Sequence, residues 1–424
     1  GADSNWEHSV SRIGGFGFVP DNVPEAVVTP RVGIGAWVNE IQNYNPDSAM
    51  VLLQQDNNDS GVDFLTEQMD YVVSQGQTMI FMVNVCHGTV SELIDFYDEL
   101  TTAGVTISEF RLSSEVSTSC SSGTPNTSMT SAQYIAAATP FIDYIQYNYG
   151  GIPITVNAAK RNFYTWSNDD LYDFCVSKGI KLFSQYLWLE ATSSETNQDA
   201  YFNDILTKLR TNLYDEALPR VAGYYTTFSG MSFRIGQGGT NDQLSGKIEG
   251  TMLQAIMLYN LFFELWDYNK THNDFVSGFT FLTNTKAVNR YQGKDALFSI
   301  NSYFTSTDGI NTFVTRTMGA AYQLLSVIHN TTDTITYIEV TLTGAPSLLG
   351  AAGFQVGGYV YVFIYNAGTE TTISTIKVDA AAQTNTTRET IYGNKLYSSI
   401  GTCPAFNLFG GTPSNVDRVQ GAIS

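Results

Sequence analysis

The chain has 424 residues, of which 43% are hydrophobic and 13% aromatic, so it can bury more than one small core. Only 14% of the residues are charged, and the formal net charge is −19. Nucleic acids and anionic membrane surfaces are recognised through basic patches, so the charge balance excludes both as partners. Membrane insertion is not expected, because no apolar run reaches the roughly 18 residues that a span needs.

The chain carries five sequons for N-glycosylation and few basic residues. Together these features favour an extracellular or cell-surface protein whose signal peptide has been removed. The sequons place the possible glycosylation sites at Asn58, Asn126, Asn269, Asn330 and Asn385.

The chain has four cysteines, too few for a disulfide scaffold. Cys86 ends one predicted strand and Cys120 lies just past the next, so a disulfide between them is one possibility and two unrelated buried thiols the other. No spacing of Cys and His resembles a zinc site. We therefore expect neither a metal nor a cofactor.

Short apolar runs alternate with helical patterns over most of the chain. The runs predict eight strands, at residues 9–19, 31–38, 78–85, 107–112, 152–156, 180–189, 220–228 and 275–282. Helical spacing of apolar residues predicts helices at 62–73, 91–103, 133–149, 168–177, 201–213, 248–266 and 313–328. This alternation is typical of an α/β fold in which eight parallel strands close into a (β/α)8 TIM barrel. The link between the first two predicted strands is too short for a helix.

The pattern changes after Asn330. Residues 334–343, 359–365, 371–378 and 389–392 alternate at period two or run β-branched, with Gly and Asn between them. Such short strands predict a C-terminal antiparallel β-sandwich. We predict a barrel domain over residues 1–329 and a sandwich domain over 330–424, which N-terminal residues could complete.

Barrel enzymes carry their functional groups at the C-terminal ends of the strands. The predicted strands place there Asn39, Glu40, Asn84, His87, Glu115, Asn157, Tyr186, Glu190, Thr226 and Thr227. Trp37 and Trp188 could line such a cleft as walls for sugars, although tryptophan at such positions is more often part of a core. No Gly-rich phosphate loop follows a strand, so a polysaccharide or oligosaccharide is the expected partner.

Three short motifs support this interpretation: Val83-Asn84, Gly88-Thr89 and Leu112-Ser113-Ser114-Glu115. They resemble the clan-A retaining glycoside hydrolases of the arabinofuranosidase and agarase-like branches. In that group a strand ending in Val-Asn precedes a Gly-Thr helix start, and the next strand ends in Leu-Gly-Asn-Glu. The resemblance implies that Glu115 is the general acid/base on strand four. It also implies that Asn84, Ser114, Tyr186, Trp37 and Trp188 contact the sugar.

The resemblance also requires a nucleophilic Glu at the end of strand seven, in a Thr-Glu-Phe type motif. The predicted strand there ends in Thr226-Thr227-Phe228, so Thr227 occupies the nucleophile position. Ser114 stands where the family has the Asn that binds the sugar 2-hydroxyl. A retaining mechanism needs two carboxyl groups about 5–5.5 Å apart, and Thr cannot attack without a base to activate it.

Two functions remain open on these grounds. The favoured one is a glycoside-hydrolase-like protein with impaired catalysis, acting in carbohydrate binding or as a structural surface protein that assembles with copies of itself. The alternative is an active secreted hydrolase in which Glu190 or Glu40 serves as the second carboxylate, at the about 6.5–9.5 Å of an inverting pair. An engineered loss of the nucleophile is a third explanation, for which Thr would be an unusual choice.

Overall fold

The structure is a computed structural model. It describes residues 73, 78–83, 85, 88–113, 129–159, 166–241, 252–281, 285–287, 298–301, 312–315, 334–344, 349–366, 377–378, 381–382, 387–392 and 417–422. The strands predicted at 9–19 and 31–38 lie outside these residues, as does the predicted helix at 62–73 except for Val73.

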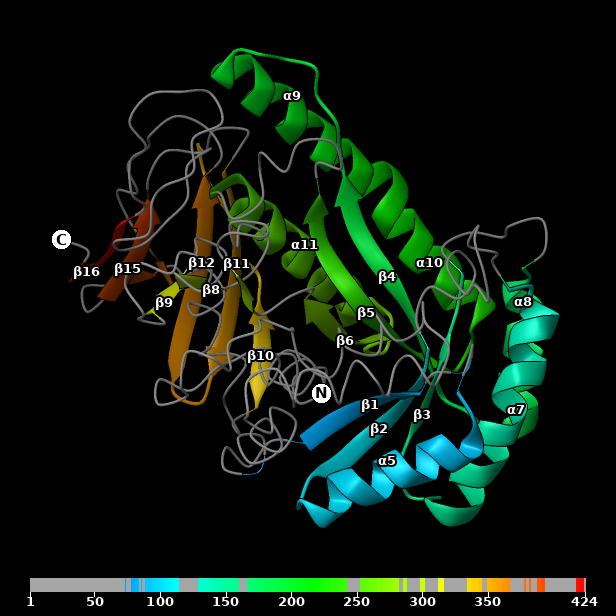
Figure 1. The fold of residues 1–424 in the computed structure, drawn as a ribbon. Coiled ribbons are helices and arrows are strands. Elements are labelled where there is room, and N and C mark those ends of the chain that lie inside the picture. The colour runs from blue at the N-terminus through cyan, green and yellow to red at the C-terminus, as the bar shows by residue number, and fades with distance from the viewer. Residues whose placement is uncertain are drawn as a thin grey trace.

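A six-stranded sheet forms the centre of the described chain. Its strands are β1 (Thr78–Val83), β2 (Thr106–Leu112), β3 (Ile154–Asn157), β4 (Leu182–Glu190), β5 (Ser232–Asn241) and β6 (Val276–Phe281). Every neighbouring pair is parallel, and the strands lie side by side in chain order. The sheet is curled, with helices along its outer side (Figure 1). Parallel strands in sequential order that curl in this way form an arc of a TIM-like barrel, here a half-barrel.

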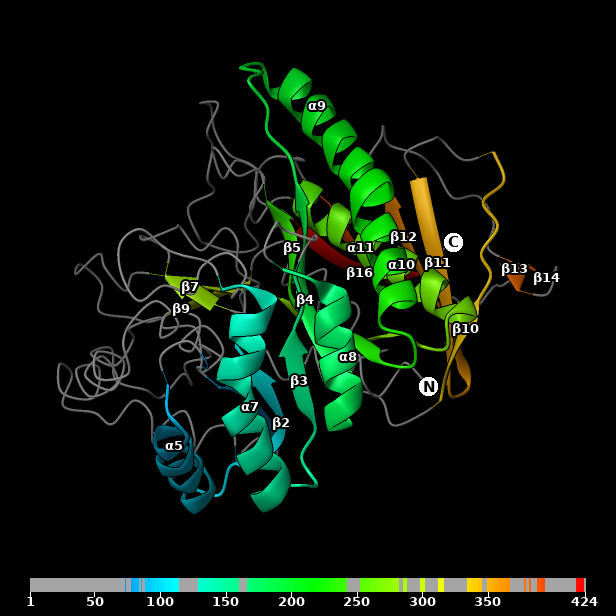
Figure 2. The ribbon, with the colours of Figure 1, turned by 90° about the vertical axis from the view of Figure 1, so that its right-hand side faces the viewer.

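Each crossover between these strands contains at least one helix. The helices are α5 (Val90–Thr102), α7 (Ser131–Asn148), α8 (Asn168–Lys178), α9 (Gln198–Thr211), α10 (Leu218–Thr227) and α11 (Met252–Thr271). A capping box between Thr130 and Gln133 begins α7, and the Ser167 side chain caps α8. Gly179 ends α8 at φ +67°, a conformation that glycine adopts without strain. Figure 2 shows α7 and α8 side by side against the sheet.

The strand predicted at 220–228 is wrong, because these residues form α10. Val221, Tyr224 and Phe228 are buried at helical spacing, although the same run also fits a strand. The strand in this part of the sheet is β5, which begins twelve residues later at Ser232. Because β5 contains glycines and polar residues, it has no apolar run from which a strand could be predicted. The helix predicted at 313–328 is also wrong at its start, where β9 (Thr312–Thr315) lies.

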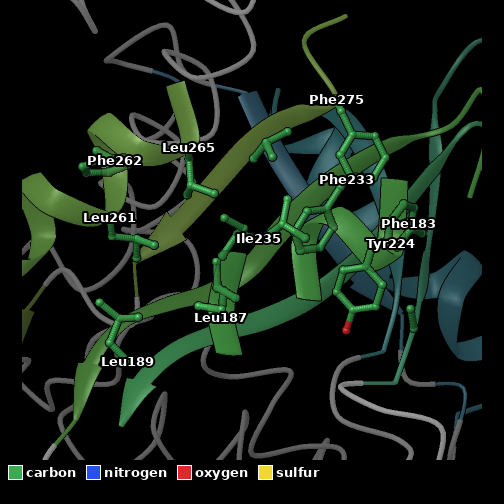
Figure 3. Close-up of a cluster of buried hydrophobic side chains, with 14 of the residues drawn as sticks. Phe183, Leu187, Leu189, Tyr224, Phe233, Ile235, Leu261, Phe262, Leu265 and Phe275 are labelled. Atoms are coloured by element: carbon green, nitrogen blue, oxygen red, sulfur yellow. The ribbon is translucent and has the colours of Figure 1, made fainter. Parts of the chain in front are cut away.

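Aromatic side chains fill the space between the sheet and its outer helices. The ring of Phe183 stacks on Phe228 at 3.9 Å between centroids and on Phe233 at 5.1 Å. Tyr224 approaches Phe233 at 5.2 Å, and its hydroxyl donates to the carbonyl of Ala159 at 2.7 Å. Figure 3 shows the rings of Phe183, Tyr224 and Phe233 with Leu187 and Leu261 in the same cluster. This cluster fixes α10 and α11 against β4 and β5.

Helix α11 lies between the barrel sheet and a second, antiparallel sheet of β10 (Ile335–Ile338), β11 (Leu349–Val356) and β12 (Tyr359–Asn366). Residues on every side of the helix are buried. Trp266 approaches Phe354 at 4.4 Å, and the Lys270 ammonium lies 3.9 Å from the centre of the Tyr337 ring. The apolar side chains of α11 therefore pack into two hydrophobic cores, one against the barrel sheet and one against the C-terminal sheet. None of the described helices, α11 included, has the length and hydropathy needed to cross a membrane.

The remaining described strands are short. They are β7 (Thr285–Ala287), β8 (Phe298–Asn301), β13 (Lys377–Val378), β14 (Ala381–Ala382), β15 (Thr387–Tyr392) and β16 (Asp417–Ala422). With β9, the first two form a three-stranded sheet, and the others form two antiparallel pairs. The C-terminal part is therefore antiparallel, while its closure into a sandwich and the domain boundary near residue 330 stay predictions.

We expect Phe354→Ala to lower the free energy of unfolding by about 3–5 kcal/mol, because it leaves a cavity where α11 meets the C-terminal sheet. Tyr359→Ala is the matched control, since Tyr359 lies on the next strand but is 72% exposed; its effect should stay within about 0.5 kcal/mol. Urea unfolding measures both. If both variants lose equally little free energy of unfolding, the two cores do not share α11.

Candidate functional site

Alternate residues of the sheet strands face the interior of the curled sheet, and on β2 and β5 several of these residues are charged. The helix side carries residues such as Phe110 and Phe183, while the inner side carries Glu109, Arg111 and Arg234. All three charged side chains are buried, with Glu109 fully so. TIM barrels usually fill this space with branched apolar residues. The charged interior is therefore the feature that most distinguishes this sheet.

Glu109 is the centre of an ion cluster. Its Oε2 lies 2.7 Å from Nε of Arg234 on β5, and its Oε1 lies 3.4 Å from Nη2 of Arg111 on its own strand. The hydroxyl of Thr155 on β3 donates to the same Oε1 at 2.7 Å. A buried carboxylate is stable only when paired in this way. Glu109 is thus used in holding three strands together and is not available as an acid or base.

Arg111 reaches from β2 across the interior to β5. Its Nη1 donates to the carbonyl of Gly236 at 3.4 Å, although the two residues are 125 positions apart in the chain. A Cβ on Gly236 would lie 3.5 Å from this Nη1 and 3.5 Å from Cβ of Ser184. The pKa of Arg111 is lowered, mainly by burial and further by the charge of Arg234, against the raising effect of Glu109. Among the described residues, the guanidinium groups of Arg111 and Arg234 both contact the Glu109 carboxylate.

Ser113 ends β2 in a left-handed conformation, with φ +61°. It is fully buried, and its hydroxyl donates to the carbonyl of Val83 at 3.0 Å and accepts from the amide of Val85 at 2.9 Å. The motif that the sequence resembles has Gly at this position, which explains the conformation. Ser113 therefore ties the ends of β1 and β2 together, immediately before the segment that contains Glu115.

Strands β4 and β5 continue well past the ends of β2 and β3. In the register of the sheet, Leu112 at the end of β2 pairs with Val156 of β3, which pairs with Phe183 of β4. Strand β4 continues from there to Glu190 and pairs with β5 as far as Asn241. We name residues 186–190 and 237–241 the β4–β5 wall. The amide of Glu190 donates to Oδ1 of Asn212, in the π-helix η2 (Asn212–Ala217) that follows α9, at 3.1 Å. The wall is therefore supported at its far end.

The wall presents alternating side chains. Leu187 and Leu189 are buried, whereas Tyr186, Trp188 and Glu190 are half-buried. The Trp188 ring lies over Gly239 of β5, where a Cβ would come within 3.1 Å of the ring. Gly239 has φ +150°, so both the conformation and the space favour glycine. An aromatic ring beside a carboxylate on a half-exposed face can hold a sugar by stacking and hydrogen bonding.

Glu190 lies far along the wall. It is seven residues beyond Phe183, or about 23 Å past the level of Leu112 at the rise of a strand. Glu115 lies outside the described residues, so a catalytic pair of Glu190 with Glu115 stays a prediction.

Thr227 does not end a strand. It is the last residue of α10, half-buried, before the start of β5. Its assignment to the nucleophile position rested on the strand at 220–228 and falls with it. The strand that takes the seventh place, if two strands precede β1, is β5, whose described residues Ser232–Asn241 include no Asp or Glu. Thr226 is exposed on α10, where its hydroxyl donates to the carbonyl of Ala222 at 3.2 Å.

Two predicted residues have structural roles. Asn269 is buried in α11, where its Nδ2 donates to the Val276 carbonyl at 2.8 Å and its Oδ1 accepts from the Val276 amide at 3.0 Å. Asn269 is only 4% exposed, which leaves no space for a glycan, so the predicted glycosylation there does not fit the fold. Asn157 is buried at the end of β3, and its Nδ2 donates to the Ser184 carbonyl at 3.4 Å.

The other predicted site residues lie outside the described part of the chain and stay predictions. They are Trp37, Asn39, Glu40, Asn58, Asn84, Cys86, His87, Ser114, Glu115, Cys120, Asn126, Asn330 and Asn385. Within the described ranges, no group of three or more His, Cys, Asp or Glu residues could hold a metal ion.

No protein-family model matches the sequence, and no curated protein matches it. Among solved structures, a conserved exported protein from Bacteroides fragilis matches with a TM-score of 0.50 at 12% identity, over 83% of this chain and 76% of that one. An α-L-arabinofuranosidase from Thermotoga maritima matches with a TM-score of 0.49 at 12% identity, over 85% and 74%.

A family 51 α-L-arabinofuranosidase from Bifidobacterium longum, AbfB, matches with a TM-score of 0.47 at 11% identity, over 70% of this chain. The alignment spans 63% of the Bifidobacterium enzyme, less than two thirds of its length. Glycoside hydrolases are thus among the structures that this chain resembles. At such low identities the likeness concerns the fold alone.

We expect Glu109→Gln to lower the free energy of unfolding by about 3–5 kcal/mol, because it leaves two buried guanidinium groups without their carboxylate. Glu195→Gln is the control, since Glu195 is exposed and should change stability little. Chemical denaturation of both variants measures the difference. An unchanged Glu109→Gln protein would mean that the cluster does not hold the strands.

The variants Ser113→Ala and Ser113→Gly separate the contribution of the Ser113 hydroxyl from that of the left-handed backbone conformation. The Ala variant keeps the left-handed strain and loses the hydroxyl, so we expect a loss of about 1–3 kcal/mol from the unpaired Val85 amide. The Gly variant loses the same hydrogen bonds but relieves the strain, so it should be the more stable of the two. Thermal unfolding of the pair tests this order, and the reverse order would contradict it.

Proposed function

We propose that the protein binds carbohydrate through the β4–β5 wall and does not carry out retaining hydrolysis. The observation that carries the proposal is the half-buried row of Tyr186, Trp188 and Glu190, set beside a β5 strand that offers no carboxylate. Sugar sites combine aromatic walls with a few placed polar groups. The wall supplies both, with its main ring held over bare backbone at Gly239.

The described carboxylates argue against a catalytic pair. Glu109 is locked in the interior by Arg234 and Thr155. Glu190 lies at the far end of the wall, seven residues beyond the level at which β2 ends. Glu115 remains the acid/base that the resemblance implies, and hydrolysis with retention needs a second carboxyl group about 5–5.5 Å away. A glycoside-hydrolase-like fold used for binding fits these facts best.

The setting we propose is extracellular. The sequons and the acidic, lysine-poor composition support it, although Asn269 no longer counts among the usable sequons. Association with other copies of the chain is a further prediction from composition. Size-exclusion chromatography with light scattering tests that association directly.

We expect Trp188→Ala to weaken binding of a neutral plant or algal oligosaccharide by about tenfold, the value of one stacked ring of roughly 1.4 kcal/mol. Tyr147→Ala is the control, because Tyr147 is 89% exposed at the end of α7, away from the wall. Isothermal titration calorimetry over a panel of such sugars measures both. Equal binding by the wild type and Trp188→Ala would remove the wall as the site.

An active hydrolase remains the second candidate, and the strained Ser113 just before Glu115 favours it, because strain of this kind concentrates at active sites. Release of reducing ends from the same panel tests for activity. Activity that disappears in Glu115→Gln and persists in Glu190→Gln would establish hydrolysis with another second carboxylate. No release by the wild type supports the binding function.

A further inference from the structure

We propose that Tyr359 and Tyr361 form a second saccharide-binding surface, which takes an uncharged sugar. Both residues lie on β12 of the C-terminal sheet, where Tyr359 is 72% exposed and Tyr361 is half-buried. Their ring centroids are 6.4 Å apart. We name this pair the tyrosine platform. It is independent of the β4–β5 wall, because it lies on a different sheet.

The sequence of β12 separates aromatic from aliphatic side chains. Alternate residues of a strand point to opposite faces of its sheet. One face of β12 is therefore entirely aromatic, while the other begins with three branched aliphatic residues. The aromatic face carries Tyr359, Tyr361, Phe363 and Tyr365, and the aliphatic residues opposite are Val360, Val362 and Ile364. No residue of this strand is charged.

Helix α11 covers the far part of the aromatic face. The ring of Phe263 on α11 lies 5.9 Å from that of Phe363 and 6.2 Å from that of Tyr365, between centroids. Phe363 is buried as a result, and exposure then rises through Tyr361 to Tyr359. Figure 1 shows β11 and β12 as the orange strands beside α11. The platform is thus the end of the aromatic face that is open to a ligand.

The size of the platform favours a small ligand over a protein. An aromatic side chain buries about 150–250 Å² when it is fully covered, so two tyrosines offer at most about 500 Å². A stable protein–protein interface buries roughly 800 Å² on each partner. Two adjacent rings on one strand therefore match a ligand of one or a few ring-shaped units.

The chemistry of the platform favours an uncharged sugar among such ligands. Nucleobases also stack on exposed aromatic rings, but the net charge of −19 repels a nucleic acid. Purely apolar ligands bind in concave pockets that bury most of their surface. A sugar ring has an apolar C–H face and hydroxyl groups at its edge, and tyrosine combines an apolar ring face with a hydroxyl in the same way.

The experiment is affinity electrophoresis of the full chain in native gels that contain arabinan, galactomannan or xyloglucan, which are neutral polysaccharides. We expect Tyr359→Ala to weaken binding by about fivefold, the effect of one stacked ring. Tyr359→Phe keeps the ring, so it should bind within about twofold of the wild type. Val360→Thr is the control, because it changes the opposite face of the same strand and should leave binding unchanged.

The outcomes separate the platform from the wall. Weaker binding by Tyr359→Ala but not by Trp188→Ala supports the platform and removes the wall. Equal binding by the wild type and Tyr359→Ala overturns the inference, and so does a wild type that no polysaccharide retards. An equal loss in Tyr359→Phe and Tyr359→Ala also overturns it, because stacking on the ring would not be the cause. If light scattering shows that Tyr359→Ala only separates copies of the chain, the platform is a contact between copies and the inference is wrong.

Discussion

The contact between Glu109 and Arg234 constrains the whole barrel part of the structure. It joins β2 to β5 across the inside of the curled sheet, and Thr155 attaches β3 to the same carboxylate. An apolar interior would tolerate small shifts of one strand against another, whereas a buried carboxylate requires its partners at fixed positions. The cluster therefore specifies the register of distant strands. It also holds the Glu109 carboxylate in ion pairs and a hydrogen bond within the sheet.

The second constraint comes from α11. A helix at the edge of a protein buries one face, but α11 buries residues on all sides, because the barrel sheet lies against one side and the C-terminal sheet against the other. Tyr214 of η2 adds a hydrogen bond to Glu264 of the same helix, at 2.7 Å. The helix thereby connects the support of the β4–β5 wall with the C-terminal sheet. The two parts of the chain are mechanically coupled through it.

Hydrophobic periodicity predicted the secondary structure well where the residues fitted only one pattern, that of a helix or that of a strand. Strands β1 to β4 and helices α5, α7 and α8 were predicted within a few residues. The segment with Val221, Tyr224 and Phe228 satisfied both a strand and a helix pattern, and only the aromatic cluster around Phe183 decides between them. Strand β5 carries Gly236 and Gly239, which are needed for close contacts that no local pattern reveals.

In the candidate site, too, the sequence predicts residues on single strands but not the contacts between strands. Tyr186, Trp188 and Glu190 were predicted at a strand end and form one face of the wall. Glu109 and Arg111 alternate visibly with apolar residues in β2, so the sequence could have shown that one face of that strand is charged. It could not have shown the partners, because Arg234 and Gly236 lie more than a hundred residues away in the chain.

Gly239 sets the height of the Trp188 ring, because the missing side chain lets the ring rest directly on the neighbouring strand. The ring is therefore supported from beneath by the backbone of the sheet. On the proposed function, the surface on which a sugar stacks belongs to the strands, and any side chain in place of Gly239 would lift the ring off that surface.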